Sequence, residues 1–156
     1  MAVGAIGGWA LTAQERLNPP SPLVRAESGP SAGSEAIALA TAQRAQDLGL
    51  PGLAADLYRQ AREMPGVDRA RISLALATAL LDASRPEEAE KILEEISAPR
   101  GSAWQLRAGL AAVQQRRLET ARAAVAAVRE TELSADDLPW LWFLQGELVD
   151  LAQAGE

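Results

Sequence analysis

Small residues recur at matched places along the chain, and this recurrence restricts the fold more than any other feature. Ala54, Ala89 and Ala121 are separated by 35 and 32 residues. A period of this length is typical of helix–turn–helix units that stack on one another. Two antiparallel helices joined by about four residues approach closely only where small side chains meet, so the spacing predicts helical hairpins. The matched positions are the turns at Gly49, Ser84 and Arg116, five residues before each alanine, and the small residues Ala42, Ala77 and Gly109, twelve residues before.

Helical periodicity extends over most of the chain. From Ser34 onward apolar residues recur every three to four positions, the pattern of amphipathic helices. Alanine, the residue with the highest helix propensity, accounts for 33 of the 156 residues. Turn signals such as Pro65-Gly66, and the capping box at 84–87, separate the segments. No strand is predicted, and helices are predicted over 35–48, 52–64, 68–83, 86–97, 102–115, 118–130 and 136–153.

Two segments carry a resemblance to a known family. Residues 84–93 (SRPEEAEKIL) and 48–61 (LGLPGLAADLYRQA) resemble the turn and second helix of a tetratricopeptide repeat (TPR). For residues 35–153 the resemblance implies an all-α, right-handed superhelical solenoid of about three and a half TPR-like repeats. The repeats would cover 35–66, 68–99 and 102–133, with a half repeat at 136–153, inside a domain of residues 35–156. The alternative is another solenoid of helical hairpins.

The N-terminal part differs from the rest in composition. Residues 2–13 are uncharged and small or apolar, and too few to cross a bilayer. Residues 1–17 are interpreted either as the remnant of a signal peptide or membrane anchor, or as a frayed terminus. The first interpretation favours an exported or cell-envelope protein that is tethered to a membrane through its N-terminus; the second favours a cytoplasmic one. Residues 18–34, rich in proline, glycine and serine, are predicted to form a flexible linker.

Composition excludes several kinds of chemistry. The chain has no histidine and no cysteine, so it lacks the residues of Ser-His-Asp and Cys-His nucleophiles and of Cys/His zinc sites. The segment 130–156 has seven acidic residues and no basic one, which disfavours nucleic acid as a partner. Asp136 and Asp137 fall at a predicted helix start, where acidic residues favour the helix dipole. We therefore expect no catalytic residues, no cofactor and no metal.

The resemblance also implies where a partner would bind. In TPR arrays the first helices of the hairpins line a concave groove that holds peptides or partner helices. Trp140 and Phe143 have two interpretations, as part of a binding hot spot or as residues that pack on a further helix. The residues carried over to this groove are Gln43, Gln46, Asp47, Arg71, Leu74, Thr78, Leu81, Asp82, Gln105, Leu106, Leu110, Gln114, Trp140, Phe143, Glu147 and Asp150.

The leading hypothesis is therefore a non-catalytic scaffold that binds a protein or peptide segment in this groove. An alternative is the recruitment or regulatory region of a longer enzyme, or of a cell-envelope assembly factor, that continues beyond Glu156. The half repeat at 136–153 fits either a terminal cap or a longer array. A third hypothesis is self-association through this last helix.

Overall fold

The described part of the chain is entirely helical. The computed structural model describes residues 32–97 and 99–153, which contain seven α-helices and no β-strand. This confirms the predicted all-α class. The segment 1–17 and most of the predicted linker lie outside the described residues. The helices are α1 (Ala32–Asp47), α2 (Pro51–Arg62), α3 (Arg69–Asp82), α4 (Pro86–Glu94), α5 (Ser102–Gln114), α6 (Leu118–Ala126) and α7 (Leu138–Gln153), with a 3-10 turn η1 (Glu130–Glu132) before α7.

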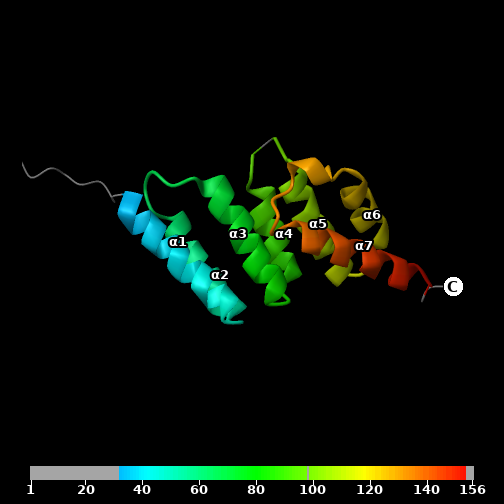
Figure 1. The fold of residues 1–156 in the computed structure, drawn as a ribbon, viewed down its shortest axis with the longest axis horizontal. Coiled ribbons are helices and arrows are strands. Elements are labelled where there is room, and N and C mark those ends of the chain that lie inside the picture. The colour runs from blue at the N-terminus through cyan, green and yellow to red at the C-terminus, as the bar shows by residue number, and fades with distance from the viewer. Residues whose placement is uncertain (1–31, 98, 154–156) are drawn as a thin grey trace, which may run out of the picture.

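The helices follow one another along the long axis of the molecule. Figure 1 shows α1 and α2 at one end and α6 and α7 at the other. Each helix packs on the next one in sequence, and α5 also contacts α3 and α7. Contacts between every second helix place α3, α5 and α7 side by side, which builds a surface from segments far apart in the sequence.

The same turn joins the two helices of each of the first three pairs. Gly49, Ser84 and Arg116 all have left-handed backbone conformations, with φ of 73°, 56° and 58°. In each turn the next N–H donates to a carbonyl five residues back, which satisfies a free carbonyl at the helix end. These bonds join Leu50 to Ala45 (2.9 Å), Arg85 to Leu80 (2.8 Å) and Arg117 to Ala112 (2.8 Å). The predicted turn positions are thus correct, and the next helix begins two residues after each of them.

The small residues lie where the helices cross. Ala54, Ala89 and Ala121 are completely buried, as the spacing predicts, and so are Ala42 and Ala77. Gly109 shows why a small residue is needed. A Cβ atom on Gly109 would lie 3.4 Å from the Cβ of Ala124 and 2.8 Å from the Cδ2 of Leu144. The helices α5, α6 and α7 therefore meet at a point that leaves almost no room for a side chain.

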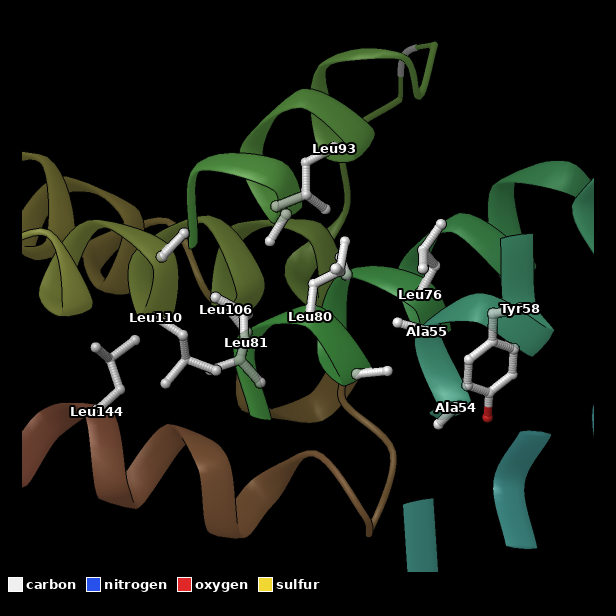
Figure 2. Close-up of a cluster of buried hydrophobic side chains, with 14 of the residues drawn as sticks. Ala54, Ala55, Tyr58, Leu76, Leu80, Leu81, Leu93, Leu106, Leu110 and Leu144 are labelled. Atoms are coloured by element: carbon white, nitrogen blue, oxygen red, sulfur yellow. The ribbon is translucent and has the colours of Figure 1, made fainter. Parts of the chain in front are cut away.

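One apolar core extends along the successive helices. Large aliphatic side chains fill the spaces between the close crossings, and Figure 2 shows those of α3, α4, α5 and α7 pointing toward one another. Burial of such side chains is the main favourable contribution to folding. The largest fully buried side chains are Ile72, Leu76, Leu80, Leu93, Leu106, Leu141 and Leu144.

Several helix ends differ from the prediction. The first helix begins at Ala32, so residues 32–34, which were assigned to the linker, are helical. The helix predicted over 118–130 ends at Ala126. There the Ser102 hydroxyl accepts the Arg129 N–H (2.9 Å) and donates to the Glu132 carboxylate (2.7 Å). This contact with α5 draws the chain away from the axis of α6, and no local sequence signal reveals it.

Candidate binding groove

A large cavity of about 740 Å³ lies along the first helices of the pairs. On α3 it is lined by Arg71, Leu74 and Thr78, which are spaced three and four residues apart and so share one face of the helix. Helices α1 and α5 also contribute side chains spaced three or four residues apart. Tyr58 of α2 and the segment before α7 complete the lining. The other residues that line it are Leu39, Ala40, Gln43, Gln46, Tyr58, Ile72, Ala75, Ala103, Arg107, Ser134, Asp136, Asp137 and Trp140.

A small cavity of about 220 Å³ adjoins the large one at Trp140, which lines both. Phe143 stands at its edge in a T-shaped contact with Trp140, with 6.4 Å between the ring centroids. The lining is mainly apolar and comes from α3, α5, the turn after α5 and α7. We refer to the two cavities together as the groove. The other residues of the small cavity are Leu81, Leu110, Val113, Gln114, Arg116, Glu147 and Leu151.

Arg107, which lines the large cavity, links α3, α5 and the segment that precedes α7. Its Nε donates to the Thr78 hydroxyl (2.8 Å) and to the Leu74 carbonyl (3.1 Å). Its Nη2 donates to Oδ1 of Asp137 at 2.9 Å, and both side chains are only 13% exposed. A charged pair in this setting has a well-defined geometry, because each ion is held by several partners. Arg107 therefore sets the distance between α3, α5 and the start of α7.

Two amide side chains, those of Gln46 and Gln114, link neighbouring helices along the groove. Nε2 of Gln46 donates to Oδ2 of Asp82 at 2.6 Å, which links α1 to α3. Burial raises the pKa of Asp82 above its ordinary value of 3.8, while the Gln46 hydrogen bond and the charge of Arg107 oppose that rise. Gln114 donates to the Leu81 carbonyl at 3.0 Å and links α5 to α3. These two hydrogen bonds thus fix neighbouring helices to one another.

Tyr58 adds a side chain from a second helix to the groove. Its hydroxyl donates to Oε1 of Gln43 at 3.2 Å, and Nε2 of Gln43 donates to Asp47 at 2.9 Å. Burial raises the pKa of Tyr58, and the negative charge of Asp47 raises it further. The hydroxyl therefore stays protonated at neutral pH and remains a hydrogen-bond donor to Gln43.

Two charged side chains of the large cavity are free of internal partners. Among the described residues, neither the Arg71 guanidinium nor the Asp136 carboxylate has a hydrogen bond or an ion pair. Both residues are exposed. The indole N–H of Trp140 likewise has no hydrogen-bond acceptor in the part of the chain that the structure describes. These groups are available to a ligand, whereas Arg107 is already occupied.

Most of the residues predicted to face the groove are brought together there. Gln43, Gln46, Arg71, Leu74, Thr78 and Trp140 line the large cavity. Leu81, Leu110, Gln114, Phe143 and Glu147 line the small one. Asp47 and Asp82 line neither cavity but bond to groove glutamines. Gln105 and Asp150 line neither cavity.

The prediction was wrong at Leu106. This side chain is 1% exposed and belongs to the core, and Arg107 lines the large cavity instead. Leu110 and Gln114 of the same helix do line the small cavity, so the error does not extend along the whole helix. A local signal could have pointed to Arg107: it is the only charged residue of Ser102–Gln114. Its partner Asp137 comes from a distant segment, which no local pattern predicts.

A third cavity, of about 650 Å³, is lined by residues of α2, α3 and α5 and by the segment between α4 and α5. Its Arg62 is paired with Glu95 at 2.9 Å. Its Trp104 donates its indole N–H to the Leu93 carbonyl (2.9 Å) and packs under the guanidinium of Arg100, 4.5 Å from the ring centroid. Trp104 thus connects α5 to α4, so its role at this cavity is structural.

Comparison with known proteins gives no match to a protein-family model, a curated protein or a solved structure. Within residues 32–97 and 99–153 no group of three or more acidic residues is arranged to hold a metal ion. Over the same residues, every helix is too short or too polar to cross a membrane. What the groove does therefore has to be inferred from its own geometry and chemistry.

Proposed function

We propose that this chain is a non-catalytic protein-interaction module that holds an extended segment of a partner protein in the groove. Its helical pairs would form a TPR-like right-handed solenoid, with α1, α3, α5 and α7 on the concave side. One observation carries the proposal. Side chains from these four helices line two cavities that meet at Trp140.

The groove offers a partner two kinds of contact. In the large cavity, the guanidinium of Arg71 and the indole N–H of Trp140 can donate to carbonyl or carboxylate oxygens. In the small cavity, Leu81, Leu110 and Phe143 offer apolar contact to one buried side chain. A well-packed pocket with an aromatic residue at its edge is the usual composition of a binding hot spot. The expected ligand is a segment with an apolar anchor and an acceptor group on opposite sides of Trp140.

A peptide selection tests this proposal. Random 12-residue peptides are selected on the purified chain, and the affinity of synthetic copies is measured by fluorescence anisotropy. Trp140→Ala and Arg71→Ala are expected to weaken binding by about tenfold or more each, as hot-spot truncations do. Arg44→Ala is the matched control, because Arg44 is exposed on α1 and lines neither cavity.

The selection can also contradict the proposal. Selected peptides that bind equally to the wild type and to both groove variants would place the site elsewhere. A loss of binding in Arg44→Ala of the same size as in Arg71→Ala would show that only overall charge matters. In either case the groove would have no specific role in recognition.

A further inference from the structure

The charged residues that line the groove are divided between its two sides. In the part of the chain that the structure describes, the positively charged lining residues all come from α3, from α5 and from the turn that follows α5. The negatively charged ones all come from α7 and the segment before it, and α7 has no basic residue. The first side carries Arg71, Arg107 and Arg116, and the second carries Asp136, Asp137 and Glu147.

Only one charge of each side is neutralised inside the groove. Arg107 pairs with Asp137 at 2.9 Å, and both side chains are largely buried. The other charged lining residues have no side-chain hydrogen bond and no ion pair with any of the described residues; they are Arg71, Arg116, Asp136 and Glu147. A positive and a negative side chain therefore remain free in each of the two cavities.

The acidic residues of α1 and α3 do not cancel the positive side. The Asp68 carboxylate accepts the backbone N–H of Arg71 at 3.0 Å and forms no ion pair with its guanidinium. Asp47 and Asp82 are bonded to groove glutamines, and neither residue lines a cavity of the groove. A ligand in the groove thus meets positive side chains toward α3 and α5 and negative ones toward α7.

We infer that the partner segment is of mixed charge, with an acidic side chain toward α3 and α5 and a basic side chain toward α7. This inference rests on the proposed function, since it specifies the segment that the groove would hold. A uniformly acidic segment would bring like charges against Asp136 and Glu147, and a uniformly basic one would do so against Arg71 and Arg116. Like charges placed together in an interface suppress wrong partners. The apolar anchor in the small cavity supplies affinity, and the charges select among segments that share it.

Charge reversal on both molecules tests this inference. The peptides used are those from the selection described above whose binding is weakened by Trp140→Ala, and each is expected to contain both an acidic and a basic residue. Replacing the acidic residue by lysine is expected to weaken binding by about tenfold, and Arg71→Glu or Arg116→Glu to restore it. Replacing the basic residue by glutamate is expected to weaken binding by a similar factor, and Asp136→Lys or Glu147→Lys to restore it.

Arg69→Glu and Asp150→Lys are the matched controls, because both residues are exposed, on α3 and α7, and line neither cavity of the groove. They are expected to restore no reversed peptide, and restoration by either would overturn the inference, since net charge would then suffice. Groove-binding peptides with charges of one sign only, or with affinities unchanged by reversal, would also overturn it and leave the proposed function standing. If Trp140→Ala weakens no selected peptide, the proposed function itself fails, and this inference fails with it.

Discussion

Nη2 of Arg107 on α5 lies 2.9 Å from Oδ1 of Asp137, the residue that precedes α7. Thirty residues separate the two in sequence. Asp137 is itself held by Ser134, whose hydroxyl donates to the carboxylate at 3.0 Å and accepts the Asp137 N–H at 3.2 Å. The pair therefore fixes where α7 begins relative to the groove.

Removal of Arg107 is expected to destabilise the fold strongly. Arg107→Met retains most of the buried stem but leaves Asp137 without its partner, and such a loss costs about 3 kcal/mol of unfolding free energy. Urea unfolding measures this value. Arg71→Met is the control, because it removes an unpaired, exposed arginine and should change stability by less than about 0.5 kcal/mol. A double-mutant cycle with Asp137→Asn should give a coupling energy of about 1 kcal/mol or more. A coupling near zero would contradict the role assigned to the pair.

The second and third turns are expected to become more stable with glycine. Ser84 and Arg116 have φ of 56° and 58°, a conformation that costs a non-glycine residue about 1 kcal/mol. Ser84→Gly and Arg116→Gly should each raise the unfolding free energy by roughly 0.5–1 kcal/mol. Ala83→Gly is the control; its φ is −81°, so glycine there should only lower stability. Thermal unfolding followed by circular dichroism distinguishes these outcomes, and a gain at Ala83 equal to that at Ser84 would refute the explanation.

Gly109 of α5 and Gly146 of α7 are expected to respond in opposite ways to a larger side chain. Gly146 faces open space, so Gly146→Ala should stabilise α7 by about 0.5–1 kcal/mol. At Gly109 a valine would collide with Ala124 and Leu144, so Gly109→Val should cost about 1–3 kcal/mol. Both changes are measured by urea unfolding. Equal responses at the two positions would show that the crossing of α5 with α6 is not tight.

Stability is expected to depend on the protonation of Asp82. Because its pKa is raised above 3.8 in the folded chain, the folded state takes up this proton at a higher pH than the unfolded state. Stability therefore falls as pH rises from 3.8 through the folded pKa, and the cost persists at pH 7. Asp82→Asn keeps an acceptor for Gln46 and should be more stable than the wild type at pH 7, with the difference lost below pH 3.8. Asp150→Asn controls for the removal of one negative charge. A gain that is the same at pH 3 and pH 7 would contradict the prediction.

The sequence predicts the local features of this fold well. All seven predicted helices are present among the described residues, and the predicted turn positions Gly49, Ser84 and Arg116 have left-handed conformations. These features depend on residues within a few positions of one another. The burial of Ala54 and its counterparts follows from the same short period.

Features that depend on distant segments could not be predicted in this way. Arg107 was missed because its role is defined by Thr78 and Asp137, which lie 29 and 30 residues away. The end of α6 was misplaced because Ser102 binds Arg129 across 27 residues. The direction of the last aromatic residues was also undetermined, since both faces of α7 are apolar. The structure directs Trp140 and Phe143 to the groove and leaves Trp142 exposed and outside its lining.

The repeated turn described above also bears on how the chain acquires its structure. Each of the three turns is closed by residues five positions apart, and most helix contacts join neighbours in the sequence. Topologies dominated by short-range contacts fold quickly, because little chain entropy is lost before the first contacts form. A nascent polypeptide of this kind can therefore organise one pair of helices at a time as it leaves the ribosome, without waiting for its C-terminus.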